Sequence, residues 1–343
     1  MDYGLRLPGN VMTIHHVIKY IGKRWSSLWV VCILAAGASI LHLAGCNTKK
    51  IMVAVVPRTS GTMLWEPEHT GVERGVWSQD VYVYWNAPMR EDDVQGQIDI
   101  LTRAVDRGAK GLIVSPVEAL PLRTPVYSVL QRGIPVVVIG TDLDLAAGKN
   151  LAYVLSDEDR GGQLAARRVG SLLKGRGTVA ILGISNQLTG TTQRARSLEK
   201  TLAEEFPGIH VTFRSFALPT VSQEQQVTER LLAKSSQVDA ILALTEASTR
   251  GAYYALTDFD KISGTRLIGF DQDLLVPIHN GGIDSVIMQN TYQMGRVAMK
   301  LMDEEMHGGA SRSYVMVQPQ LVTRENIDSA QTQEMLDLSW FNK

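Results

Sequence analysis

Short apolar runs rich in Val and Ile alternate with helical patterns along the chain after Lys50, and this alternation constrains the fold most. Five runs occupy residues 51–56, 81–85, 111–115, 135–140 and 152–156, and five more occupy residues 178–183, 210–215, 240–245, 266–271 and 284–289. Continuous apolar runs of this length are typical of strands covered on both faces, as in parallel sheets. The pattern therefore predicts repeated β-α-β units.

The segments between these runs have the spacing of amphipathic helices. Val94, Ile98, Leu101 and Val105 recur at helical intervals, and Gly108 follows where a helix would end. Ten strands exceed the usual sheet of about 4 to 6 strands, so we predict an α/β fold with two doubly wound parallel-sheet lobes. Ligands of such sheets bind beyond the carboxyl ends of the strands. Residues that end strands are therefore the candidates for a site.

An uncharged apolar segment precedes the alternating region. Residues 25–45, "WSSLWVVCILAAGASILHLAG", follow Lys19, Lys23 and Arg24. A basic flank, an apolar stretch and small residues at its end are typical of a secretory signal. An uncleaved membrane-spanning helix is the alternative, because the stretch approaches the length of about 20 residues that a bilayer requires. Both interpretations place the rest of the chain outside the cytoplasm.

The end of this segment, Leu43, Ala44, Gly45 and Cys46, resembles the lipobox of bacterial lipoproteins. The resemblance implies cleavage before Cys46, a diacylglycerol on its thiol, and an exported, membrane-anchored protein in the periplasm or at the cell surface. The signal peptide would then be residues 1–45. Which membrane carries the anchor stays open, as does whether translation starts at Met1 or Met12.

Composition excludes several classes of function. The chain of 343 residues has a formal net charge of −1 without a basic stripe, which argues against a nucleic-acid partner. The stretch from Met12 faintly resembles a helix-turn-helix start, but the apolar residues that follow cannot contact phosphates or bases. The two cysteines are Cys32 and Cys46, so the exported part has no disulfide.

Motifs for catalysis and metal binding were not found. The sequence has no G-x-S-x-G elbow, no phosphate-binding P-loop and no H-E-x-x-H helix. His69, His210 and His279 are scattered without the spacing of metal ligands. We therefore predict a protein that is not an enzyme and that needs no cofactor and no metal.

Several segments together resemble the type I periplasmic binding proteins, which include ribose, galactose and xylose binders and are related to the ligand-binding core of sugar-responsive, LacI-like repressors. They are "RGIPVVVIGTDLDLAAGKNLAYVLSDEDRGGQLAARRV" (132–169), "RGAKGLIVSP", "LIGFDQD" and "SVIMQNTYQMGRVAMKLM". The resemblance covers residues 50–325. It implies two lobes, joined by three crossover segments, that hinge shut around a ligand. The lobes would be residues 50–156 plus 290–318 and residues 157–289 plus 319–328, with a tail at 329–343.

The resemblance also implies ligand contacts at the strand ends. Asp271 stands where the family places a carboxylate for sugar hydroxyls, although Asp is equally suited to cap a helix. Arg194 stands where the family has a ligand-binding Arg, with Arg196 or a solvated helix face as alternatives. Gln289, at the hinge, can donate and accept, and an interlobe hydrogen bond is its alternative role. Trp65 could stack on a sugar ring or pack beneath the first helix.

Three further candidates depart from the common family pattern. Asp142 follows Gly140, which replaces the first of a pair of aspartates usual in sugar binders. Ser115 and Thr245 stand where an Asn is common. Because of these three departures, we do not assign to this protein the pentose or hexose ligands that are common in the family.

These observations predict a lipid-anchored substrate-binding protein of a sugar-type ABC importer, which captures a small polyol or sugar by hinge closure. Its partners would be the ligand, the permease subunits and, through the lipid on Cys46, a membrane, and the protein would be a monomer. A ligand-presenting sensor for a receptor or chemoreceptor is the first alternative. A repressor-type ligand-binding core is the second, and an enzyme is a distant third.

Overall fold

The computed structural model describes residues 50–60, 63–185, 189–234, 238–270, 272, 274–308 and 313–342. The predicted signal peptide, Cys46 and Asp271 lie outside the described residues. Residues Lys50–Lys343 form one compact unit, which contains all four clusters of buried apolar side chains. Among the described residues, no helix is long and apolar enough to cross a membrane, and no group of His, Cys, Asp or Glu could hold a metal ion.

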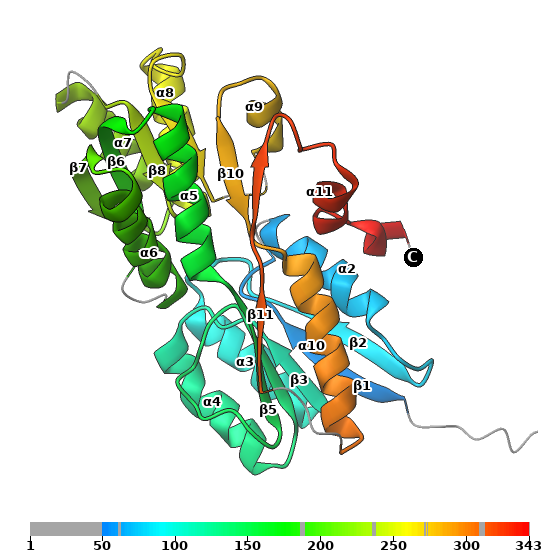
Figure 1. Ribbon diagram of the computed structural model, residues 1–343. Coiled ribbons are helices and arrows are strands. Elements are labelled where there is room, and N and C mark those ends of the chain that lie inside the picture. Colours follow the sequence, from blue (N-terminus) through cyan, green and yellow to red (C-terminus); the bar gives the residue numbers. More distant parts are fainter. Residues whose placement is uncertain are drawn as a thin grey trace, which may run out of the picture. The chain divides into compact units, whose positions relative to one another are not determined.

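The first sheet has six parallel strands in the order β11-β5-β4-β3-β1-β2 (Figure 1). Its strands are β1 (Ile51–Val56), β2 (Val81–Trp85), β3 (Gly111–Val114), β4 (Val136–Ile139), β5 (Leu151–Ser156) and β11 (Tyr314–Val317). The short helix η1 (Met63–Trp65) leads into α2 (Glu66–Arg74). One face of the sheet packs on α2 and α10 (Thr291–Met306), and the other on α3 (Val94–Asp106) and α4 (Ala119–Gln131). We call this half the N-terminal lobe.

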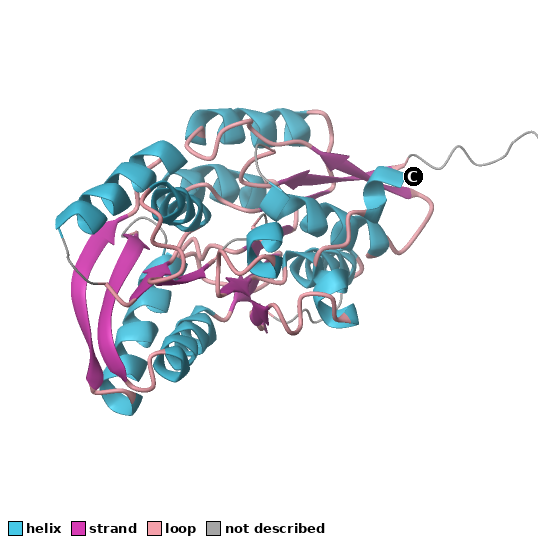
Figure 2. Ribbon diagram, turned by 90° about the horizontal axis from the view of Figure 1, so that it is seen from above, coloured by secondary structure: helices cyan, strands magenta, loops and turns pink. Residues whose placement is uncertain are grey.

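The second sheet has the order β12-β10-β9-β8-β6-β7. Its strands are β6 (Arg176–Ile184), β7 (Gly208–Phe216), β8 (Ala240–Ala243), β9 (Arg266–Gly269), β10 (Ser285–Met288) and β12 (Gln320–Thr323), of which only β12 is antiparallel to its neighbour. One face packs on α5 (Glu158–Leu172) and α6 (Thr189–Glu205), and the other on α7 (Val221–Lys234), α8 (Glu246–Asp258) and α9 (Leu275–His279). We call this half the C-terminal lobe, and Figure 2 shows the helices flanking its strands.

The chain crosses between the sheets three times: after β5, after β10, and between β11 and β12. Side chains fix these crossings. Asp157 caps α5 by accepting from the Arg160 amide, and its other oxygen accepts from Gln318 Nε2 at 2.9 Å. Asn290 caps α10 by accepting from the Gln293 amide. A capped helix start at a crossing sets the direction of the chain as it enters the next lobe.

Two close helix contacts orient the segments that carry strand-end residues. A Cβ added to Gly71 of α2 would collide with the Tyr292 carbonyl of α10, so these helices meet backbone to backbone. A Cβ added to Gly162 of α5 would collide with the Arg194 carbonyl of α6. Glycine removes the steric barrier at both contacts.

The structure confirms the predicted α/β class and the two mainly parallel sheets. Apolar runs such as Val136–Ile139 are fully buried because helices cover both faces of the sheet. The chain passes from one sheet to the other near residues 156, 289 and 318. Lobe boundaries at these residues stay our proposal. Beyond the ten predicted runs, β11 and β12 add one strand to each sheet.

Candidate functional site

Buried polar residues gather at the carboxyl ends of the strands in both lobes. In the C-terminal lobe the centre of the group is Arg194, whose side chain is only 5% exposed. Its Nε and Nη2 atoms lie 2.7 and 2.6 Å from Oε2 of Glu158, the first residue of α5. Its Nη1 donates to the Leu244 carbonyl, and its guanidinium lies 3.9 Å from the centroid of the Phe270 ring. The predicted ligand contact is thus held by protein groups on several sides.

Gln289 joins the same group through Glu158. Its Nε2 donates to Glu158 Oε1 at 3.2 Å, and its backbone carbonyl accepts from Gln272 Nε2 at 2.7 Å. The two oxygens of Glu158 therefore bind two residues that the sequence had indicated separately, Arg194 and Gln289. We call Glu158, Arg194, Phe270, Gln272 and Gln289 the C-lobe cluster.

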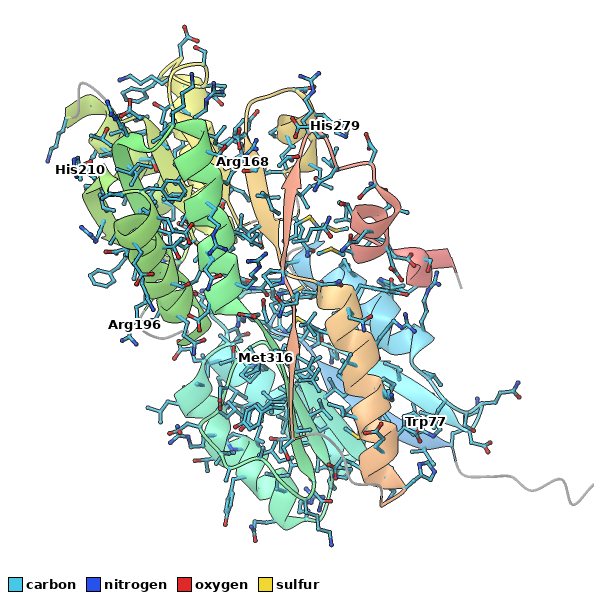
Figure 3. All side chains as sticks on the ribbon, viewed as in Figure 1. Trp77, Arg168, Arg196, His210, His279 and Met316 are labelled. Atoms are coloured by element: carbon cyan, nitrogen blue, oxygen red, sulfur yellow. The ribbon has the colours of Figure 1, made fainter. Side chains whose placement is uncertain are left out.

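The two arginines of α6 differ in burial. Arg196 is exposed on the outer side of α6, as Figure 3 shows, and Arg194 is buried. A buried guanidinium loses hydration and needs a partner, which Glu158 supplies. Arg196 is thus the solvated residue, and Arg194 is the one that belongs to the buried cluster.

The N-terminal lobe contributes a second group around Trp65, which ends η1 and precedes α2. Its side chain is 2% exposed, and the Arg58 guanidinium lies 5.3 Å from the centroid of its ring. The Trp65 Nε1 donor has no partner among the described residues. Gly140 lies beside the ring, where an added Cβ would sit 3.9 Å from Trp65 Cη2. Trp65 is therefore buried at the residue before α2, with Gly140 beside its ring and the Arg58 cation over it.

Glu68, in the first turns of α2, is the most unusual member of this group. It is fully buried, and the Ser115 hydroxyl lies 3.2 Å from each of its carboxylate oxygens. Burial raises the pKa of Glu68 to about 8, although the Ser115 hydrogen bond and the Arg58 charge act in the opposite direction. Near neutral pH the carboxyl is therefore mostly protonated. Ser115 itself, a predicted ligand contact, is engaged with Glu68.

Arg58 completes the group, which we call the N-lobe cluster: Arg58, Trp65, Glu68 and Ser115. Its Nε donates to the Pro116 carbonyl at 3.3 Å and its Nη2 to Thr141 Oγ1 at 3.1 Å. Burial lowers the pKa of Arg58, while Glu91 and Glu68 raise it, and the Arg194 charge lowers it. Because this pKa responds to Arg194 and Glu158, the two clusters lie within electrostatic reach of each other.

Two other predicted residues have local structural roles. Asp142 Oδ1 accepts from the Asp144 amide at 2.7 Å, which stabilises a turn where Asp144 has a φ of 55°. Thr245 caps α8 in a capping box with Ser248, whose amide lies 3.1 Å from the Thr245 hydroxyl. Both residues lie at strand ends, as expected, and both are half-buried.

Five cluster members, Arg58, Glu68, Glu158, Phe270 and Gln272, were missed by sequence reasoning, and the two glutamates show why. Glu158 follows Asp157 at a helix start, where acidic residues are common because they favour the helix dipole. Glu68 lies in "EPEHTGVER", whose charge density is typical of a surface helix. No local signal in either segment points to burial beside an Arg.

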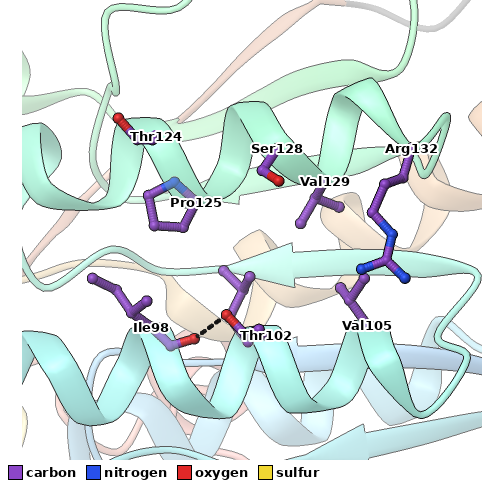
Figure 4. Close-up of a pocket in the computed structure, with 9 residues that line it drawn as sticks. Ile98, Thr102, Val105, Thr124, Pro125, Ser128, Val129 and Arg132 are labelled. Atoms are coloured by element: carbon purple, nitrogen blue, oxygen red, sulfur yellow. Dashed lines mark hydrogen bonds between the residues drawn. The ribbon is translucent and has the colours of Figure 1, made fainter.

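A separate groove lies on the outer side of the N-terminal lobe. It has a volume of about 200 Å³ and lies between α3 and α4, with Ile98, Thr102, Val105, Pro125 and Val129 in its wall (Figure 4). It contains no member of either cluster. We therefore place the candidate site at the two clusters and not at this groove.

Two mainly parallel sheets with helices on both faces and three crossings between them define a two-lobed α/β protein. A family model described as a periplasmic binding protein domain matches residues 53–310, and the chain belongs to this family. Membership confirms the predicted resemblance, and it confirms the prediction of a binding protein that is not an enzyme.

Individual relatives are distant but cover most of the chain. A xylitol-binding protein of Mycolicibacterium smegmatis is 24% identical over 315 residues, which is 87% of this chain and 86% of the relative. The ribose import binding protein of Bacillus subtilis is 24% identical over 64% of this chain and 70% of its own length.

Solved structures agree with the fold. An ABC transporter solute binding protein from Agrobacterium vitis, bound with α-D-tagatopyranose, has a TM-score of 0.76 at 17% identity and covers 83% of this chain and 99% of its own. A carbohydrate transporter solute binding protein from Agrobacterium radiobacter, in complex with D-arabinose, has a TM-score of 0.76 at 21% identity and covers 84% and 99%.

Proposed function

We propose that this protein captures a sugar or small polyol between its lobes and delivers it to the permease subunits of an ABC importer. The observation that carries the proposal is the pairing of the N-lobe cluster with the C-lobe cluster at the carboxyl ends of the strands. Two relatives are named as a xylitol-binding protein and a ribose import binding protein, and these names support a sugar or polyol as the ligand. The chemistry is capture by hydrogen bonding and closure, without a covalent step.

Unpartnered polar atoms indicate what the ligand would supply. Among the described residues, Trp65 Nε1 and Gln272 Oε1 are buried without a hydrogen-bond partner. A buried polar atom without a partner costs about 1–3 kcal/mol. A ligand that offers an acceptor to Trp65 and a hydroxyl donor to Gln272 would recover this energy. Polyols and sugars carry both functions on neighbouring atoms.

Closure would follow from differential affinity. A ligand that contacts Arg58 and Trp65 on one lobe and Gln272 and Gln289 on the other binds best when the clusters are close. The ligand then shifts the lobes toward the closed arrangement, because only a difference in affinity can move such an equilibrium. The permease would recognise that closed arrangement.

The ligand need not be a common pentose or hexose. Ser115 is engaged with Glu68, Thr245 caps a helix, and Gly140 offers no carboxylate. We infer that ligand contacts in the N-terminal lobe come chiefly from Arg58 and Trp65. Because Arg58 is a cation, sugar acids belong in the test beside neutral sugars and polyols.

A lipid on Cys46 would anchor the protein, with cleavage before that residue. A diacylated Cys would hold the chain to a membrane because two acyl chains bind far more strongly than one. Mass spectrometry of the protein from a bacterial membrane fraction tests this proposal. A mature N-terminus at Cys46 with added acyl mass supports it, and an intact N-terminal segment favours a membrane-spanning helix.

A thermal-shift screen of residues 47–343 tests the binding function. A ligand at about 100 times its dissociation constant should stabilise the fold by about 2.7 kcal/mol. Pentoses, hexoses, inositols, alditols and sugar acids form the panel. We expect Arg58→Gln to reduce the stabilisation to about 1.4 kcal/mol or less, as a tenfold loss of affinity requires, and Arg196→Gln, on the exposed side of α6, to preserve it. If no member of the panel raises the melting temperature, the sugar assignment is wrong.

A further inference from the structure

The last residues of the chain contact both lobes. After β12 the chain forms α11 (Ala330–Met335) and η2 (Ser339–Asn342). Figure 1 shows α11 and the C-terminus on the side of the molecule where α2 and α10 lie, and η2 contacts α2. We call residues 329–342 the C-terminal strap.

One end of the strap is anchored in the C-terminal lobe. Met335 is 1% exposed and belongs to the apolar core that includes Ile327 and Val322. The Thr332 hydroxyl accepts from Gln320 Nε2 at 3.0 Å and lies 2.9 Å from the Asn326 carbonyl, to which it donates. Buried apolar contacts and paired polar groups fix α11 to the sheet that contains β12.

The other end is docked on the N-terminal lobe. The Trp340 ring lies 3.9 Å from the His69 ring, which is stacked on Trp85 at 4.1 Å with an interplanar angle of 3°. Arg74 Nη2 lies 2.8 Å from Asp337 Oδ2 and 3.0 Å from Ser339 Oγ. These contacts bind both the middle and the end of α2, the helix that begins directly after Trp65.

We propose that the C-terminal strap is an interlobe latch, which ties the core of the C-terminal lobe to α2 and stabilises the arrangement of the lobes in which the two clusters are buried. The strap adds a noncovalent connection to the three crossover segments. If α2 moved away from the C-terminal lobe, the contacts of Trp340 and Arg74 would be strained or broken. The latch thus acts on ligand affinity without touching the ligand.

The size of the effect follows from the contacts. The free energy of an aromatic contact of this kind changes an equilibrium constant by roughly two- to tenfold. Loss of the Trp340 contact should therefore reduce the ratio of closed to open molecules by roughly two- to tenfold, and the apparent affinity falls with the competent fraction.

The test measures the distance between the lobes and needs no ligand. Residues 47–343 contain no Cys, so Ser128→Cys on α4 and Gln226→Cys on α7 give one exposed spin-label site in each lobe. Pulsed dipolar spectroscopy gives the distance distribution for the parent, for Trp340→Ala, and for a chain that ends at Leu336 and so keeps α11. Arg74→Ala is the mildest variant, because its side chain is 51% exposed.

Arg132→Ala is the matched control. Its side chain is 50% exposed and its Nη1 pairs with Asp106 at 2.9 Å, all within the N-terminal lobe. We expect the three strap variants to gain a longer-distance population and the control to keep the parent distribution. Strap variants with the parent distribution, whether or not their melting temperatures fall, would overturn the latch. Because Arg74→Ala leaves both cores intact, a folding failure of the other variants does not remove the test.

Discussion

Arg194 contacts a single oxygen of Glu158 through two nitrogen atoms, Nε at 2.7 Å and Nη2 at 2.6 Å. Both side chains are nearly inaccessible, at 5% and 7% exposure. A buried pair of this kind has little net stabilising value against apolar replacements, but removal of one partner leaves an uncompensated charge. The pair therefore makes the C-lobe cluster sensitive to the substitution of either partner.

We expect Arg194→Ala to lower the free energy of unfolding by about 3–5 kcal/mol, because the Glu158 carboxylate is left buried and unpaired. Urea unfolding of residues 47–343 measures the change. Arg167→Ala is the control, since Arg167 pairs with Glu205 at 2.8 Å on the surface, where a pair is worth about 0–1 kcal/mol. A loss for Arg194→Ala no larger than that of the control would contradict the role assigned to the pair.

Glu68 should make the stability of the fold depend on pH. Its folded-state pKa, about 8, lies above the unfolded value. At pH values between the two, Glu68 is protonated in the folded state and ionised in the unfolded state. The stability that Glu68 contributes is fully present below the unfolded pKa and is lost as pH rises through the folded pKa. The slope is at most about 1.4 kcal/mol per pH unit from this group.

The measurement is the free energy of unfolding between about pH 5 and 9 for the parent and for Glu68→Gln. The Gln side chain has nearly the shape of a protonated Glu but does not ionise. We expect the variant to lose less stability than the parent as the pH rises. Glu204→Gln, at an exposed position on α6, is the control and should follow the parent. Parallel curves for the parent and Glu68→Gln would show that Glu68 is ionised in the folded protein at neutral pH.

The fold was predictable because its signal is local. Runs such as Val136–Ile139 are apolar at every position, and only strands covered on both faces need that pattern. The short helix α11 has no such signal. Six residues, Ala330–Met335, are too few to show a periodic face, and their burial depends on contacts with β12.

The site was predictable only in part, because its geometry is made by contacts between residues far apart in sequence. Arg194 and Gln289 were indicated by resemblance, but Glu158, which joins them, lies 36 residues from one and 131 from the other. Arg58 was not among the predicted residues, and its position above Trp65 depends on the path between β1 and η1. Side-chain contacts between segments far apart in the chain leave no periodic trace in the sequence.

Gly162 should be intolerant of a side chain. In Gly162→Ala the new Cβ would collide with the Arg194 carbonyl, so α5 and α6 must separate. Overpacking of this kind costs about 1–3 kcal/mol, and it displaces Glu158 relative to Arg194. We expect lower stability in urea unfolding together with weaker ligand binding. Gly264→Ala is the control, because its added Cβ would meet only the Lys261 carbonyl at 3.9 Å; equal stability of the two variants would refute the close-contact argument.

Arg58 and Trp65 should act together in ligand binding. The guanidinium lies over the ring at 5.3 Å, and a cation and a ring so placed attract each other by about 0.5–2 kcal/mol. In calorimetric titrations with the compound found in the thermal-shift screen, Trp65→Ala and Arg58→Gln should each weaken binding at least about tenfold, a loss of 1.4 kcal/mol. The double variant should lose less than the two separate losses combined, because each single change also removes the contact between the two side chains. Full additivity would show that the ligand contacts Arg58 and Trp65 independently, and undiminished binding in both single variants would place the ligand away from the N-lobe cluster.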